Sequence, residues 1–406
     1  MPRVNHNILK WARTTAGLDE EQAAKKLGMK DTKMARAIEK LTALENGDVF
    51  PTRSQLVKMS KHYRRPLLTF YLSDLPRIGN RGQDYRTLPE TVEITQEALV
   101  DVVIRDIRAR QALVRSVLED EDEATKLPFI SSLQMADGVD AAINSLQKYL
   151  EWNLSEYRNQ PDIDKAFAFL RGQAEVAGVF VLLIDNLGSH HTTIDVEAFR
   201  GFALADDVAP FIAVNANDSK GAWCFTLVHE LAHLLLGATG VSSNSGNYGE
   251  QEIEKFCNDV ASEFLVPMEE IQQLGLTNKT DFHTAKGLIK QFALRCKVSN
   301  TMIAYKLCRA NFITYDRFKE FKTAFRAEYL KWKTAQKLKG KEKGGGPNYY
   351  VTKKHRVGNG LINLVARMMQ GGAITTTKAG RVLGVRPQNV PGVIENSRPQ
   401  VLQNFV

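Results

Sequence analysis

The chain has 406 residues, enough for two or three domains that each bury a core of their own. Its composition, 43% hydrophobic and 25% charged, is ordinary for a soluble protein, and its longest purely apolar run, residues 179–184, is far too short for the roughly 20 residues of a membrane-spanning helix. We therefore expect no membrane-bound segment. The N-terminal residues lack an apolar signal core and the four cysteines are scattered, which favours a cytoplasmic protein with reduced thiols.

The net charge of +8 is distributed unevenly. Residues 1–90 contain 17 Lys and Arg against 10 Asp and Glu, and residues 317–367 contain 14 against 3, so the middle of the chain is acidic. This pattern indicates that nucleic acid, if bound, is held by the basic regions. A lysine-rich helix can equally be a solvated face, and both interpretations stay open for the second region.

Residues 1–75 predict a compact all-helical unit. Its first helix is marked by the apolar spacing of Ile8, Leu9 and Ala12. Capping and stop residues give the remaining boundaries: Asp19 and Gly28 for the second helix, Thr32 and Asn46 for the third, and Thr52 and Pro66 for the starts of the last two. Short helices joined by a glycine-containing turn, with a basic surface, are features of a helix-turn-helix.

The order of residues in this unit resembles the Xre/Cro-type helix-turn-helix, in which a segment like ALENGDVFPTRSQLVKMS follows the recognition helix. The resemblance implies binding to double-stranded DNA. The stretch between Gly28 and Glu45 is longer than that family usually has. The candidate DNA contacts are Lys30, Lys33, Arg36, Lys40, Asn46 and Arg53. A small helical bundle that docks on the rest of the protein is the alternative.

A linker and a helical region are expected over residues 76–178. Gly, Pro and Arg dominate 76–90, a long charged helix is predicted at 92–125, and 135–178 supply two or three more helices. Short apolar runs bounded by Gly, Pro and Asn then predict three strands, at 179–184, 199–205 and 211–215.

From about Thr226 the pattern returns to helices and stays helical to about Lys339. The helix at 317–339 carries an apolar stripe, which predicts that it packs on the preceding domain. The stripe consists of Phe318, Phe321, Phe325 and Trp332. Residues 340–347 read as a flexible break, and 347–406 predict a small C-terminal helical appendage. The expected fold class is mainly α with a small β-sheet.

The segment HELAH, from His229 to His233, carries the clearest chemistry. Residues four apart share one face of a helix, so both imidazoles can bind one ion, and Zn²⁺ favours imidazole nitrogen. Glu230 lies close enough round the helix to act as general base on a metal-bound water. The surrounding helix is apolar almost all round, and burying these three polar groups is costly unless they are paired or bound to metal. The alternative is a pair of satisfied core histidines.

A catalytic zinc needs a third protein ligand, and the next predicted helix, QEIEKFCNDVASEFLVP, offers carboxylates. Periodicity leaves four of them open: Glu252, Glu254, Asp259 and Glu263. His190 and His191 are expected to be exposed loop residues. Cys224 and Cys257 read as small buried residues rather than as ligands.

TLVHELAHLLLG followed by EKFCNDVASEFLVP resembles the ImmA/IrrE family of zinc metallopeptidases. The resemblance extends from about Phe199 to Phe312 and implies a zincin-like domain at 179–339. It also implies that His229, His233 and Glu254 bind Zn²⁺ while Glu230 is the base. In such folds an edge strand usually aligns the substrate peptide, which makes residues 211–215 candidates for that role.

An Xre-like unit joined to an ImmA/IrrE-like peptidase recurs in proteins of bacterial and phage regulation. The resemblance therefore implies a DNA-binding regulator whose endopeptidase cleaves a specific protein, such as a repressor. The alternative is an antitoxin or transcriptional regulator of a toxin–antitoxin module, in which the metal domain mainly binds a PIN-type ribonuclease toxin. The expected partners are double-stranded DNA and a protein substrate or toxin, and a homodimer is compatible with either function.

Overall fold

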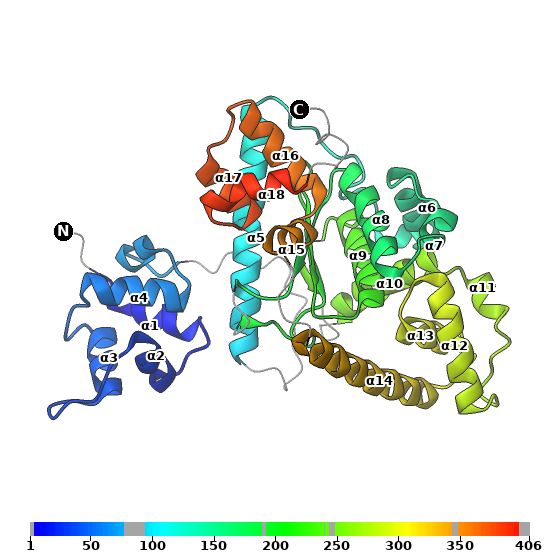
Figure 1. Ribbon diagram of the computed structural model, residues 1–406, viewed down its shortest axis with the longest axis horizontal. Helices are drawn as coiled ribbons and strands as arrows, with labels where there is room; N and C mark the ends of the chain where they lie inside the picture. The colour runs from blue at the N-terminus through cyan, green and yellow to red at the C-terminus, as the bar shows by residue number, and fades with distance from the viewer. Residues whose placement is uncertain are drawn as a thin grey trace. The chain divides into compact units, whose positions relative to one another are not determined.

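The computed structural model describes residues 4–76, 94–188, 192–238, 240–242, 248–342 and 348–397. The chain divides into two compact units, Met1–Arg81 with Leu88–Asp106 and Asn186–Ala198, and Gly82–Thr87 with Ile107–Asp185 and Phe199–Val406. Its helices and one small sheet confirm the expected mainly α class (Figure 1). Among the helices in the described ranges, none has the length and apolar character needed to cross a membrane.

The first unit is built from short helices around one apolar core. Asp19 accepts a hydrogen bond from the Gln22 N–H and Thr52 accepts one from Gln55, so both predicted N-caps are confirmed. Gly28, with φ of 71°, ends the second helix as predicted. The helices are α1 (His6–Thr14), α2 (Glu20–Leu27), α3 (Ala37–Asn46) and α4 (Arg53–Tyr63), followed by the 3₁₀ turn η1 (Leu67–Tyr71).

The third helix of this unit begins at Ala37, so the predicted start at Thr32 is wrong. Polar side chains ahead of it bind backbone groups in a non-helical conformation, which is how Asp and Thr commonly compete with a helix. The Asp31 carboxylate accepts from the Ala37 N–H at 2.7 Å, and Thr32 exchanges hydrogen bonds with Ala35. Residues 29–36 therefore form the connection between α2 and α3.

A buried ion pair joins α1 to α3. The Arg13 guanidinium donates to both carboxylate oxygens of Glu45, at 2.7 and 2.9 Å, and each residue is only 5% exposed. Two parallel charge-assisted bonds fix distance and orientation together, which explains why these two charges are accommodated in the core.

The second unit contains a four-stranded sheet of β1 (Phe180–Ile184), β2 (Gly201–Leu204), β3 (Phe211–Asn215) and β4 (Gly240–Ser242), in the order β1-β3-β2-β4. The three predicted strands are confirmed. β1 runs parallel to β3, whereas β2 is antiparallel to β3 and β4. The expectation that residues 211–215 form an edge strand is wrong, because β3 pairs on both sides. β4, which the sequence did not predict, is at an edge.

Helices precede and follow these strands along the chain. They are α5 (Ile94–Asp120), which contributes residues to both units, and α6 (Val139–Tyr149), α7 (Leu154–Arg158), α8 (Ile163–Val176), α9 (Lys220–Leu235), α10 (Tyr248–Leu265), α11 (Met268–Gln272), α12 (Phe282–Cys296), α13 (Asn300–Arg309) and α14 (Tyr315–Glu342). α9 begins six residues before its predicted start at Thr226, and it packs on β2, β3, α8 and α10. It is the central helix of the core.

The apolar stripe predicted on α14 is only partly buried. Phe318, Phe321 and Phe325 lie in the core of the second unit, and Phe321 stacks on Phe282 of α12. Trp332 is 54% exposed, so its predicted place in the buried stripe is wrong. The second half of the helix contacts the same unit through Lys333, whose ammonium donates to the Asn217 carbonyl at 3.2 Å.

Four C-terminal helices belong to the same unit as the sheet: α15 (Tyr349–Val357), α16 (Asn359–Gln370), α17 (Thr376–Leu383) and α18 (Val390–Glu395). The buried side chain of Arg171, on α8, links these helices to the sheet. It donates to the carbonyls of Val181 on β1 and of His355 and Arg356 on α15, and it pairs with Glu175 at 2.9 Å. The C-terminal region is thereby tied directly to the sheet.

Candidate metal centre

The two histidines of HELAH lie one helical turn apart on buried α9. His229 is 4% exposed and His233 is 2% exposed, and their ring centroids are 4.8 Å apart. The apolar residues between and around them hold the helix inside the core, so the imidazoles have fixed positions. The fold thus places two good metal ligands on one face of a rigid element.

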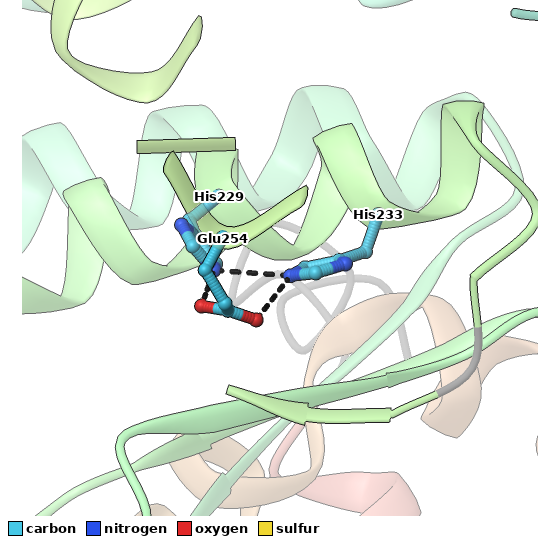
Figure 2. A group of neighbouring side chains, drawn as sticks. All are labelled: His229, His233 and Glu254. Carbon is cyan, nitrogen blue, oxygen red and sulfur yellow. Dashed lines mark hydrogen bonds and ion pairs between the residues drawn. The ribbon is translucent and has the colours of Figure 1, made fainter. Parts of the chain in front are cut away.

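Glu254 of α10 completes a three-residue cluster (Figure 2). Its Oε2 lies 3.2 Å from Nε2 of His229, its Oε1 lies 3.2 Å from Nε2 of His233, and the two Nε2 atoms are 3.1 Å apart. α9 and α10 pack directly against each other, which brings the carboxylate between the imidazoles. Within the described residues, this is the group of His, Cys, Asp and Glu that could hold a metal ion.

The spacing of these atoms fits zinc. Protein ligands lie about 2.0–2.1 Å from Zn²⁺, and in a tetrahedron such ligands are separated from one another by roughly 3.3 Å. The observed separations of 3.1, 3.2 and 3.2 Å agree with that value. Two imidazoles and one carboxylate also form a donor set that leaves the fourth position of a catalytic zinc open.

The Glu254 carboxyl is held in its ionised, metal-binding form. Burial by itself would raise its pKa, but the charge and hydrogen bonds of His229 and His233 outweigh burial and lower the pKa to about 2. Because a metal ligand must be deprotonated, this carboxylate is ready to bind a cation at neutral pH.

The other carboxylates of α10 have different surroundings. Asp259 pairs with Arg309 at 3.0 Å, and Glu263 pairs with Lys306 at 2.5 Å while accepting a hydrogen bond from the Met268 N–H. Glu252 is exposed. Of the four carboxylates that periodicity left open, only Glu254 meets the histidines.

Glu230 is completely buried and lies against the first residue of β2. A Cβ atom at Gly201 would be only 2.7 Å from its Oε1. The charges of Glu230 and Glu254 both raise the pKa of Cys257, after burial, which places the two carboxylates in one neighbourhood. That Gly201 borders this carboxylate could not be predicted from local patterns, because the contact joins residues 29 positions apart.

Neither cysteine candidate belongs to the cluster of His229, His233 and Glu254. Cys224 and Cys257 are both buried, and burial raises the pKa of Cys224 to about 12, so neither thiol is poised to ionise as a ligand. His190 and His191 lie outside the described residues.

The candidate DNA contacts all lie in the first unit. Lys30, Lys33 and Arg36 belong to the connection between α2 and α3 rather than to a helix, and all three are exposed. Asn46 at the end of α3 and Arg53 at the start of α4 are exposed as well. Lys40 is half-buried, and its ammonium donates to the Lys30 carbonyl at 2.8 Å, so it braces the connection.

Comparison with known families assigns part of the second unit. Residues 177–308 match the model of the peptidase M78 family, described as an IrrE N-terminal-like domain. The match covers roughly a third of the chain, runs from just before β1 to α13, and includes the whole His229, His233 and Glu254 cluster. No curated protein matches the chain. This similarity supports the resemblance of the second unit to ImmA/IrrE metallopeptidases.

Proposed function

We propose that the second unit is a zinc-dependent endopeptidase and that the chain is a DNA-binding regulator which cleaves a specific protein. The observation that carries the proposal is the convergence of two imidazoles and one carboxylate at 3.1–3.2 Å in a domain that matches a peptidase family. Buried polar groups this close together are unfavourable unless a cation or shared protons lie between them.

In this proposal His229, His233 and Glu254 hold the zinc. When bound, a zinc ion lowers the pKa of a water molecule and polarises the carbonyl of the scissile peptide bond. Glu230, adjacent to His229 in the chain, accepts a proton from the nucleophilic water and returns it to the leaving amine. Glu230 is completely buried, so its side chain is held in a fixed environment next to the proposed ligand His229.

The sheet suggests where a substrate peptide binds. β4 follows the HELAH helix after a short connection and, within the described part of the chain, pairs with β2 at the end of the strand order. An extended peptide can add to such an edge through main-chain hydrogen bonds. We assign substrate alignment to residues 240–242 in place of 211–215.

We assign DNA binding to the first unit. The α2–α3 pair, Gly28 between them and the exposed cations of residues 29–36 fit a helix-turn-helix with a lengthened connection. In the proposal α3 is the reading helix, while Lys30, Lys33, Arg36 and Arg53 contact phosphates. Binding of this kind weakens steeply as salt is raised, because each phosphate contact releases counterions.

The experiment that tests the proposal is Glu230→Gln in the full chain. The change keeps the size and burial of the side chain but removes its ability to take a proton. We expect zinc content and duplex-DNA affinity to stay at the wild-type level while cleavage of a partner protein, followed by mass spectrometry, falls by at least about 100-fold. Undiminished cleavage by the variant would contradict the assigned base. A partner that binds both proteins tightly and is cleaved by neither would favour the antitoxin alternative.

A further inference from the structure

The last three helices have the internal arrangement of a compact helix-turn-helix. α17 ends at Leu383, residues 384–386 form the turn, and the 3₁₀ turn η4 (Pro387–Asn389) continues directly into α18. A three-residue turn containing glycine is the usual connection in this motif. The residues that face inward from both helices are buried and small or apolar: Ala379, Val382, Leu383, Val390 and Val393.

Two glycines allow this tight connection. Gly384 has φ of 64°, a left-handed conformation that ends α17 and turns the chain, and its successor Val385 donates to the Gly380 carbonyl at 2.9 Å. Gly380 lies under the turn, where a Cβ atom would be 2.9 Å from the Val385 carbonyl oxygen and 3.2 Å from the Pro387 nitrogen. A larger residue there would push the two helices apart.

The rest of the C-terminal region supports this pair from behind. α16 packs on both α17 and α18, and α15 packs on α18. Gly392 of α18 approaches Tyr350 of α15 so closely that a Cβ atom would lie 2.5 Å from the ring. These contacts cover one side of α18. The residues that lead into this helix, Arg386, Pro387 and Gln388, are exposed to solvent.

The exposed surface of the pair is basic. Residues 376–395 contain three Lys and Arg against a single acidic residue, Glu395. Lys378 and Arg381 on α17 and Arg386 at the turn are all exposed. A polyanion is the partner that such a charge distribution fits. Arg386 and Gln388, two positions apart, are side chains of the types that read guanine and adenine edges.

We propose that residues 359–397 form a second helix-turn-helix that binds double-stranded DNA. The segment from Arg386 to Glu395 enters the major groove, with Arg386 and Gln388 facing base edges, and Lys378 and Arg381 contact the backbone. Unlike the first unit, where nine residues separate α2 from α3, this module has the short turn of a compact reader. The inference goes beyond the proposed peptidase and does not depend on it, so Glu230→Gln should bind DNA here as the wild type does.

Photo-crosslinking in the full chain tests the proposal directly. p-Benzoylphenylalanine is introduced at Gln388 in one variant and, as a control, at exposed Lys279. Lys279 belongs to the segment between α11 and α12, and Figure 1 shows these two helices away from α16, α17 and α18. The probe is a pool of 30-base-pair duplexes of random sequence at low salt. We expect crosslinks to DNA from position 388 and none from 279.

Affinity for the same duplexes provides a second readout. Lys378→Glu is compared with Lys279→Glu, which makes an identical charge change elsewhere on the same unit. We expect at least about a 5-fold weaker affinity and a shallower salt dependence for Lys378→Glu only. Failure of the chain to bind duplex DNA at low salt, or binding without any crosslink from position 388, would overturn the proposal. Crosslinks from 388 to a protein instead of DNA would show that the module is a protein-docking site.

Discussion

Gly201→Ala should show how tightly the strand beside the metal centre constrains Glu230. The added Cβ would lie 2.5 Å from Cγ2 of Thr226 and 2.7 Å from Oε1 of Glu230, whereas ordinary contact starts at 3.4 Å. The methyl group must therefore move by about 0.9 Å and the carboxylate by about 0.7 Å, or β2 must shift within the sheet. Overpacking of this size costs about 1–3 kcal/mol in the free energy of unfolding.

The same displacement should impair catalysis. A catalytic group misplaced by about 1 Å can cost on the order of 100-fold in rate, so we expect Gly201→Ala to lower peptide cleavage by about 10-fold or more. Zinc content should stay unchanged, because the three atoms nearest to the added Cβ belong to Thr226, Glu230 and Ala213 and not to the proposed ligands. Thermal unfolding, metal analysis and the cleavage rate measure the three effects separately.

Two variants control for a general effect of alanine. Gly172 lies in α8 with nothing within 4 Å of an added Cβ, so Gly172→Ala should keep activity and stabilise the protein by up to about 1 kcal/mol. Adding Thr226→Ser to Gly201→Ala removes the clashing methyl and should restore part of the stability. Wild-type stability and activity in Gly201→Ala would refute the reasoning.

Three further predictions concern other buried groups and the metal. Lys306→Met removes the ammonium that binds Glu263 and the carbonyls of Ser262 and Val266, and we expect it to lower the free energy of unfolding by about 3–5 kcal/mol, measured with urea. Glu45→Ala leaves the Arg13 charge buried without this partner and should destabilise the first unit by a similar amount, seen as an earlier melting of its helices by circular dichroism. Removing metal with a chelator should lower the melting temperature, and added zinc should restore it, because a ligand that binds only the native state stabilises that state. An unchanged melting temperature on chelation would contradict the third prediction, and losses below 1 kcal/mol would contradict the first two.

Much of the fold could be predicted because its signals are local. The N-caps Asp19 and Thr52 and the stop at Gly28 act within one helical turn, and the strand runs at 179–184, 199–205 and 211–215 are dense in apolar residues.

The predictions of the fold that are wrong concern features that depend on particular side-chain contacts or on strand pairing. The periodicity of apolar residues does not reveal such interactions. The start of α3 depends on Asp31 and Thr32, whose side chains satisfy loop backbone groups instead of a helix. β4 has only three residues, and it exists as a strand because β2 lies beside it. The interior position of β3 is likewise a property of the pairing order, which the sequence of a single strand cannot encode.

Part of the candidate site could likewise be predicted from local spacing, and part could not. The two histidines of HELAH could be paired from spacing alone, because a helix sets the geometry of residues four apart. The third ligand could not, since Glu252, Glu254, Asp259 and Glu263 share one helix and only its packing on α9 distinguishes them. The resemblance to ImmA/IrrE peptidases had to supply that choice.

Zinc content of purified variants tests the central claim most directly. Elemental analysis of the wild-type protein should give about one zinc per chain, the stoichiometry of a single three-ligand site. Glu254→Gln should lose most of this metal, whereas Glu252→Gln, an identical change at an exposed position on the same helix, should keep it. Equal zinc content in the two variants, or a wild-type protein that binds no zinc after incubation with it, would contradict the assignment of His229, His233 and Glu254 as a metal centre.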